Sequence, residues 1–415
     1  MILSYGTPGD IDAWMGLAAE LRSNFPGLET ETALEEYRDT VLRFMEKRQA
    51  IIVKEMKETA GIMLFSRGRN MICCLAVAPK YRRQGIASLM MEEALTQLDR
   101  TKEISVFTFR KEDEKGIAPR AFYEKFGFIA DALTIEMNYP HQKYVLHPEG
   151  SERRERQRAI NRMVDEIRCI LSDAAPSVYL YGSSVLDDFR LGWSDIDILV
   201  LTEKEISEAQ AKKLVSLRQS LMEIEPCNPY YRSFEGGMLS LAAFLSGQES
   251  RAVYWGTSGE RIINRYSLDC FAMKQLQECG VLLYGKEIRS RLNCPPFDAL
   301  YAGVKYHYET IRKYVQKTGR GIYSFGWMLD IARCIYTLRT GEIISKTKAG
   351  EWALENQLYP RPEALESALK VRKNPLQFRQ DPDMGDKAEA MAEEIQRFAD
   401  VLERELTENK GEMRI

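Results

Sequence analysis

The sequence LYGSS at residues 180–184, followed by SDIDILV at residues 194–200, decides how the second half of this chain is built. Apolar residues flank both polar groups, which is typical of strands whose other face is buried. On a strand, residues i and i+2 point to the same face, so we expect the carboxylates of Asp195 and Asp197 side by side. Two carboxylates at this spacing repel each other unless a cation lies between them. Because Mg²⁺ prefers oxygen ligands and combines one or two carboxylates with phosphates and water, the stretch predicts a site for Mg²⁺ and ATP.

Each part of this pattern has a simpler explanation when it stands alone. Gly182 could serve a plain turn, Ser183 could cap a helix, and the two aspartates could lie on a solvated edge strand. Together the parts favour a catalytic site, and they resemble the nucleotidyltransferase superfamily that includes DNA polymerase beta. The resemblance implies that Gly182 and Ser183 hold the ATP phosphates, that the two aspartates hold metal, and that a third carboxylate on a neighbouring strand acts as a base.

The third carboxylate is expected at Glu235, within YRSFEGGMLSL at residues 231–241. This acidic residue interrupts an apolar run that is compatible with a strand and that follows the aspartate strand. Glu223, Glu225 and Glu249 are the alternatives that the sequence leaves open.

Two further stretches, CGVLLYGK at residues 279–286 and DIARCIYTLRTGEIISK at residues 330–346, resemble the aminoglycoside (3'')(9) adenylyltransferase family. The resemblance spans about residues 170–356 and implies an enzyme that transfers AMP from ATP to a hydroxyl of an aminoglycoside. It implies that Glu235 takes the proton of that hydroxyl. Four residues are expected on this basis to orient the triphosphate: Ser183, Ser194, Arg333 and Lys346.

One segment departs from that family. Members that modify streptomycin or spectinomycin carry an acidic residue about ten positions before the arginine, whereas this chain reads GIYSFGW at residues 321–327. A cationic drug would lose one anchor there, and Tyr323 or Trp327 could offer an apolar or stacking surface instead. The acceptor is therefore expected to be a hydroxylated small molecule, with an aminoglycoside as the first candidate.

The first part of the chain carries a strand, LAVAP at residues 75–79, and then a turn, KYRRQGIA at residues 80–87, that opens a helix. Small residues in such a turn let a ligand approach the backbone, and the unpaired N–H groups of the first helical turn point at an anion. With PRAFYEKFGF at residues 119–128, the turn resembles the GCN5-related N-acetyltransferase (GNAT) family over about residues 1–140.

The GNAT resemblance implies an acetyl-CoA site. Arg82, Gly85 and Ala87 match the family's R/Q-x-x-G-x-G/A turn, with Ala87 in place of the second glycine. Tyr123 matches a tyrosine that can protonate the departing CoA thiolate, while Ile117 replaces an asparagine common before it. The residues expected to bind acetyl-CoA are Val77, Arg82, Arg83, Gln84, Gly85, Ile86, Ala87 and Ser88. The resemblance names no acceptor amine.

The order of the motifs predicts a multidomain chain of α/β and α+β class. We expect a GNAT-like α/β domain at residues 1–140, a linker at 141–150, a polymerase-beta-like nucleotidyltransferase domain at 151–297 and a C-terminal helical bundle at 298–415. The linker is expected because the stretch from Pro140 to Gly150 is polar and carries two prolines and a glycine. Amphipathic helices are expected over residues 298–316, 324–340 and 385–408.

The composition excludes several classes of protein. Of 415 residues, 45% are hydrophobic and 29% are charged, no stretch is apolar enough to span a bilayer, and no secretion signal is recognised, so we expect a soluble, cytoplasmic protein. Eight scattered cysteines and three histidines favour free thiols over a zinc site. A net charge of -3 provides no basic field for nucleic-acid binding.

Two other functions stay open. The nucleotidyltransferase part could transfer AMP to a protein or to a non-antibiotic substrate, although the added helical part offers a wall for a small-molecule cleft. The GNAT part could bind acetyl-CoA as a sensor or as a structural module.

Overall fold

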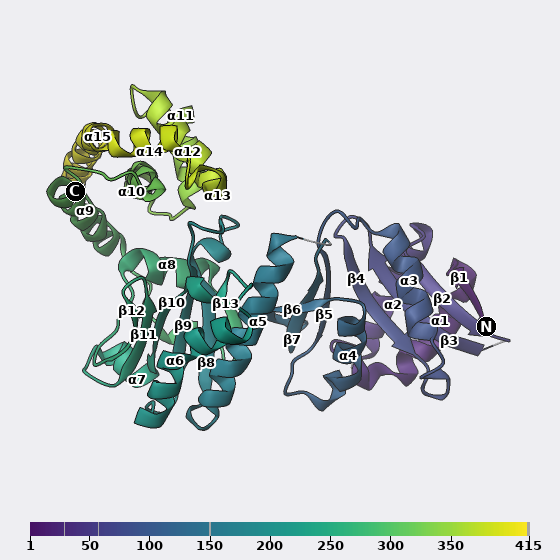
Figure 1. Cartoon of the computed structure of the whole chain (residues 1–415). Helices are drawn as coiled ribbons and strands as arrows, with labels where there is room; N and C mark the ends of the chain where they lie inside the picture. Colours follow the sequence, from purple (N-terminus) through teal and green to yellow (C-terminus); the bar gives the residue numbers. More distant parts are fainter. Residues whose placement is uncertain (29, 57, 149–150, 413–415) are drawn as a thin grey trace. The chain divides into compact units, whose positions relative to one another are not determined.

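The computed structural model describes residues 1–28, 30–56, 58–148 and 151–412, and the chain divides into two compact units, Met1–Arg162 and Met163–Ile415 (Figure 1). Each unit is built around one β-sheet. Within the described ranges, no helix has both the length and the apolar character that a membrane span requires.

The first unit is an α/β domain with a seven-stranded sheet of order β1-β2-β3-β4-β5-β7-β6. Its strands are β1 (Ile2–Tyr5), β2 (Ala50–Glu55), β3 (Glu58–Ser66), β4 (Met71–Val77), β5 (Ile104–Phe109), β6 (Ile129–Glu136) and β7 (Tyr139–Leu146). Its helices are α1 (Ile11–Glu20), α2 (Glu31–Glu46), α3 (Ile86–Gln97) and α4 (Ile117–Lys125). Apolar side chains of β2 to β5 pack against α3, so the core lies between sheet and helix.

Strands β4 and β5 separate along their length. They pair in parallel at Met71 with Ser105 and at Ile72 with Val106, although β4 continues to Val77. The carboxyl end of β4 therefore leaves the sheet ladder just before the turn that opens α3.

The linker expected over residues 141–150 is wrong for most of its length. Residues 139–146 form β7, which pairs with β5 on one side and with β6 on the other. The polar composition was misleading because polar side chains of this strand are satisfied inside the sheet: Gln142 is buried, and its Nε2 donates to the carbonyl of Asp131 at 2.8 Å. The residues 149–150 of the expected linker lie outside the described residues. The first unit consequently runs past residue 140 and ends at Arg162, inside α5 (Glu152–Ile170).

The second unit begins with a six-stranded sheet of order β12-β11-β10-β9-β8-β13. Its strands are β8 (Pro176–Tyr181), β9 (Ile196–Thr202), β10 (Phe234–Ser240), β11 (Ala252–Gly256), β12 (Gly259–Ile263) and β13 (Val281–Tyr284). The helices α6 (Glu208–Ile224), α7 (Leu241–Ser246) and α8 (Cys270–Cys279) accompany them. Strand β9 pairs in parallel with β10 and antiparallel with β8, so the strand that carries the aspartate motif is central. Its apolar side chains from Ile196 to Leu201 are buried, as a central strand requires.

The second unit ends in the expected helical bundle. The helices are α9 (Phe297–Tyr314), α10 (Gly326–Thr340), α11 (Lys346–Glu355), α12 (Pro362–Lys373), α13 (Pro375–Phe378), α14 (Pro382–Glu389) and α15 (Met391–Glu412). They share an apolar core around Phe325, Leu329 and Phe398. This core holds α10, α11 and α12 together, and these three helices supply the basic residues of the site described below.

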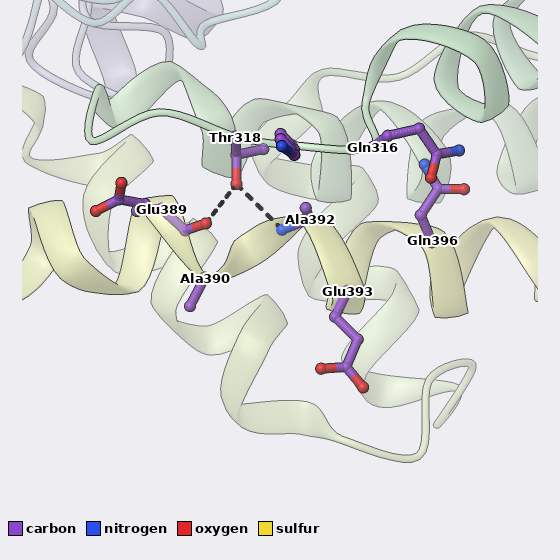
Figure 2. Close-up of a pocket in the computed structure, with 8 residues that line it drawn as sticks. Gln316, Thr318, Glu389, Ala390, Ala392, Glu393 and Gln396 are labelled. Carbon is purple, nitrogen blue, oxygen red and sulfur yellow. Dashed lines mark hydrogen bonds between the residues drawn. The ribbon is translucent and has the colours of Figure 1, made fainter.

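One helix expected at residues 385–408 is two helices in the structure. Helix α14 ends at Glu389 and α15 begins at Met391, and Thr318 lies against the break. The Thr318 Oγ1 donates to the Glu389 carbonyl at 2.9 Å and accepts from the Ala392 N–H at 3.1 Å (Figure 2). These bonds replace helical hydrogen bonds at the break. The surface hollow around Thr318 contains none of the predicted site residues.

Candidate active site

Three carboxylates meet where the central strands β9 and β10 of the second sheet begin. Asp195 lies just before β9, Asp197 lies on β9, and Glu235 lies on β10 directly across the parallel pair from Asp197. Asp195 and Glu235 lie close enough for the charge of Glu235 to act on Asp195. The alternation of a strand and the register of its neighbour therefore bring together the two aspartates and the base expected from the sequence.

The turn after β8 approaches this group too closely for any side chain. Gly182 has φ +72°, and a Cβ added there would lie 1.9 Å from Oδ2 of Asp197. The Ser183 backbone N–H donates to Asp197, and Ser183 Oγ donates to the Asp195 carbonyl at 3.4 Å. Glycine is therefore required at position 182 both for the left-handed backbone and for the contact with Asp197.

Burial and neighbouring negative charge raise the pKa of both aspartates. Burial, followed by the negative charge of Glu235, raises the pKa of Asp195 to about 6. Burial and the charges of Asp195 and Glu235 raise the pKa of Asp197 well above its usual range, and Lys346 acts in the opposite direction. The start of these two strands thus concentrates more negative charge than its surroundings balance, which is the condition under which a bound cation is favoured.

The donor set fits Mg²⁺ in the open form that nucleotide enzymes use. Across the described residues, no cluster of three or more His, Cys, Asp or Glu side chains forms a metal cage by itself. Mg²⁺ seldom uses such a cage, because it keeps waters and takes one or two carboxylates together with substrate phosphates. Asp195 and Asp197 offer those two carboxylates beside the turn at Gly182.

Two basic side chains, Arg333 and Lys346, line the cavity that also contains the three carboxylates. Arg333 lies on α10, and Lys346 is the first residue of α11, whose start is capped by the Ser345 side chain accepting from the Lys348 N–H. Arg333 Nη2 and Lys346 Nζ each donate to the carboxylate of Asp330 at 3.0 Å. Burial raises the pKa of Asp330, but Lys346 and Arg333 outweigh it and hold the pKa below its usual value. Asp330 was not predicted, although its place three residues before Arg333 on a helix is a signal that could have found it.

One cavity of about 530 Å³ contains every nucleotide-site residue that the sequence predicted. They are Gly182, Ser183, Ser194, Asp195, Asp197, Glu235, Arg333 and Lys346. The alternative bases Glu223, Glu225 and Glu249 are exposed and lie outside this cavity. The expected stacking residues Tyr323 and Trp327 are not among its lining residues either.

The cavity also contains residues that sequence reasoning missed. Trp193 lines it and packs against Tyr323, with ring centroids 5.5 Å apart. Arg372, from α12, also lines it. Outside the set of lining residues, the Tyr254 hydroxyl on β11 donates to Glu235 Oε1 at 3.1 Å, which fixes the orientation of this carboxylate. Tyr254 and Arg372 lie far from the motifs in sequence, whereas Trp193 directly precedes Ser194, and this position is a signal that could have found it.

The turn predicted to bind acetyl-CoA lies in the first unit, between β4 and α3. Val77 ends β4, and the Arg82 Nε donates to its carbonyl at 3.2 Å. Gly85 has φ +83° at the N-terminal cap of α3, with no atom within 4 Å of an added Cβ. Arg82 to Gly85 are exposed, and Ile86, Ala87 and Ser88 form the first turn of α3. Open space over helical N–H groups is the arrangement that suits a phosphate.

Tyr123, the predicted acid of the acetyltransferase part, lies on α4 and is only 6% exposed. Its ring packs edge-on against Phe122 and Phe128. Burial, with a smaller contribution from Cys74, raises the pKa of Tyr123 well above its usual value, so the phenol keeps its proton. A role in catalysis stays a prediction.

Comparisons with known proteins match different families to different parts of the chain. Residues 25–145 match the acetyltransferase (GNAT) domain, residues 162–233 match the nucleotidyltransferase domain, and residues 297–403 match the C-terminal domain of aminoglycoside adenylyltransferase. Spectinomycin 9-adenylyltransferase of Campylobacter jejuni is 23% identical over 210 residues, which are 47% of this chain and 77% of the relative. The enzyme of the same name from Staphylococcus aureus is 23% identical over 198 residues, 45% of this chain and 74% of the relative.

Solved structures match each half. A GNAT-family acetyltransferase from Bacillus cereus has 16% identity and a TM-score of 0.29, over 35% of this chain and 96% of that chain. The spectinomycin adenyltransferase AAD(9) from Enterococcus faecialis, solved with ATP and spectinomycin, has 15% identity and a TM-score of 0.40, over 58% of this chain and 97% of that chain.

Proposed function

We propose that the second unit transfers AMP from ATP to a hydroxyl of a small molecule. The chain joins a GNAT domain to a nucleotidyltransferase that is similar to the aminoglycoside adenylyltransferases. The single observation that carries this proposal is the shared cavity, in which three carboxylates of the sheet and the basic residues Arg333 and Lys346 of the helical part line one space. Carboxylates suit a metal-bound triphosphate and a hydroxyl that must lose its proton, while the basic residues suit the phosphates.

The proposed reaction is an in-line displacement. Glu235 accepts the proton of the substrate hydroxyl, the hydroxyl oxygen forms a bond to the α-phosphorus of ATP, and the bond from that phosphorus to the pyrophosphate oxygen breaks. Mg²⁺, when bound by Asp195 and Asp197, would stabilise negative charge on the phosphates. Arg333 and Lys346 compensate the charge that moves onto the pyrophosphate, and Ser183 and Ser194 orient the triphosphate. No covalent intermediate with the protein is required.

The acceptor is proposed to be an aminoglycoside-type antibiotic, because the relatives that match the second unit are named for spectinomycin. The alternative is a protein or a non-antibiotic acceptor, which the segment 321–327 keeps open because it lacks an acidic residue. Bacteria that express the chain with and without the aspartate pair, tested against a panel of aminoglycosides, separate the two: resistance that depends on the aspartates identifies the drug.

The first unit is proposed to bind acetyl-CoA at the turn around Gly85 and to transfer its acetyl group to an amine, with Tyr123 as the acid. The alternative is a domain that binds acetyl-CoA as a sensor or a structural module. Acetyl transfer to a panel of amines distinguishes them. We propose the cytoplasm as the compartment, where both co-substrates are made.

The experiment that tests the nucleotidyltransferase proposal uses the variant Glu235→Gln. It keeps the size of the side chain but removes its basic oxygen, so transfer of AMP in a single turnover should fall by about 10²- to 10⁴-fold while Mg·ATP binding is kept. Glu223→Gln, an exposed change on α6, is the matched control and should be unaffected. Asp195→Asn should abolish transfer. Unimpaired transfer by Glu235→Gln would exclude Glu235 as the base, and loss of ATP binding would make it a metal ligand or a structural residue.

A further inference from the structure

Arg372 is buried beside the proposed triphosphate site, and part of its guanidinium group has no hydrogen-bond partner among the described residues. It lies on α12, is 2% exposed and lines the cavity. Its Nη2 donates to the Asp188 carbonyl at 2.8 Å and to Asp188 Oδ2 at 3.0 Å. Its Nε is a buried atom for which the described residues provide no hydrogen-bond partner. The guanidinium also lies over the Trp193 ring, 5.6 Å from the centroid, and Trp193 lines the cavity as well.

Asp188 does not depend on Arg372 alone for its hydrogen bonds. The Thr347 hydroxyl donates to Oδ1 at 2.5 Å, and the Thr347 N–H donates to Oδ2 at 3.2 Å. Arg190, which is not among the residues that line the cavity, has its Nη2 3.6 Å from Oδ1. One buried carboxylate therefore faces two guanidinium groups, so this cluster carries a surplus of positive charge. A buried donor edge without a partner costs free energy, and an anion that binds it recovers that cost.

The position of Arg372 indicates which part of a nucleotide it would meet. Its charged neighbours include Asp188, Arg190 and Asp330, and its hydrogen bonds go to Asp188 rather than to the carboxylates of the sheet. If the α-phosphorus reacts at those carboxylates, the distal phosphates extend away from them within the cavity that Arg372 also lines.

We propose that Arg372 is a third phosphate-binding residue of this cavity, which binds the distal phosphates of ATP and the departing pyrophosphate through guanidinium N–H groups that Asp188 leaves unused, while Asp188 holds the guanidinium in place. The proposal rests on the proposed function of the second unit. Arginine presents its N–H groups as a planar fork, and the Asp188 bonds to Nη2 hold that fork in place while other N–H groups of the guanidinium stay unbonded. Each of the helices α10, α11 and α12 then supplies one basic residue, and each of these residues is held by an aspartate, Asp330 or Asp188.

The test is nucleotide binding by the full chain in the presence of Mg²⁺, with calorimetry for ATP and for AMP. Arg372→Gln leaves Asp188 without its buried partner, so the double variant Asp188→Asn/Arg372→Gln removes both charges and keeps two hydrogen-bonding amides. Both variants should bind ATP about 10- to 100-fold more weakly than the wild type, the loss expected for charge-assisted hydrogen bonds. AMP, which lacks the distal phosphates, should bind both variants within about threefold of the wild type. Arg190→Gln is the matched control, because it removes a positive charge from the same carboxylate without touching the cavity, and its ATP affinity should be unchanged.

The outcomes separate the roles. Recovery of ATP affinity in the double variant, or an equal loss for ATP and AMP, would show that Arg372 only holds Asp188 and would overturn the proposal. If circular dichroism finds the double variant unfolded, Arg372→Lys replaces it: this variant keeps the charge but loses the fork, so weaker ATP binding supports the proposal and unchanged ATP binding overturns it. A wild-type chain that binds no ATP would instead refute the function proposed for the second unit, and this proposal with it.

Discussion

Replacing Gly182 with alanine is expected to disable nucleotidyl transfer with only a modest loss of stability. The backbone there has φ +72°, and holding alanine in this left-handed region costs about 1–2 kcal/mol. The added methyl would also stand 1.9 Å from Oδ2 of Asp197, about half the distance of an ordinary contact, so the carboxylate must move by more than 1 Å. A displacement of that size at a reacting centre costs about 10²-fold in rate.

The matched control for this prediction is Gly247→Ala in the same unit. Gly247 has φ +64°, but the nearest atom to its added Cβ is Arg265 Nη2 at 3.6 Å. It carries the same backbone cost without the clash. Urea denaturation followed by circular dichroism should therefore show a loss of about 1–2 kcal/mol in the free energy of unfolding for Gly247→Ala and at least that loss for Gly182→Ala. Transfer of AMP should fall only in Gly182→Ala, and equal activities of the two variants would refute the argument that Gly182 positions Asp197.

Three further predictions concern other parts of the chain. Tyr254→Phe removes the hydroxyl that donates to the proposed base, so the transfer rate should fall about 3- to 30-fold with ATP affinity unchanged in calorimetry; a loss of ATP affinity would point to a structural role. A fragment of residues 151–415, which keeps all of α5, should fold and bind ATP like the full chain, and an insoluble or inert fragment would contradict the independence of the second unit. In the first unit, the hydrogen bond from His147, together with the charge of Arg153, lowers the pKa of Glu103 from its usual 4.5 to about 2. A carboxyl group whose pKa is lowered in the folded state stabilises the fold at a pH above its unfolded pKa, and this stabilisation is lost as the pH falls. The thermal stability of the first unit should therefore decrease between about pH 4.5 and pH 2, and Glu103→Gln should remove this pH dependence.

Much of the candidate site could be predicted from the sequence because the residues concerned lie close together in the chain. Asp195 and Asp197 are two residues apart on a strand, and the alternation of a strand alone places them on one face. Gly182 and Ser183 end the preceding strand, so their closeness to the aspartates follows from an antiparallel pair of consecutive strands. The choice of Glu235 among four glutamates needed the register of β10 against β9, which the structure supplies.

The structure corrected the prediction where composition and tertiary contacts disagree. The stretch around Gln142 reads as polar and contains turn-forming residues, yet it is a strand because a carbonyl of β6 satisfies the Gln142 amide inside the sheet. The break at Ala390 was invisible for a similar reason, since the bonds that replace the helical ones come from Thr318, more than seventy residues earlier. In both cases the deciding partner is distant in the chain.

The sequence by itself determined the two enzyme-like parts, the aspartate strand, the turns around Gly85 and Gly182 and the helical bundle, because each depends on periodicity and spacing within a few dozen residues. Only the tertiary structure decided which other side chains join them. Asp188 and Arg372 are 184 residues apart in the chain and form a buried ion pair. Asp330 accepts hydrogen bonds from both Arg333 and Lys346 and so holds these two basic side chains together. Neither Asp188 nor Arg372 belongs to a spacing pattern, since their partnership depends on how α12 docks on the loop after β8. Packing between elements, rather than the pattern within them, placed these charges around the cavity.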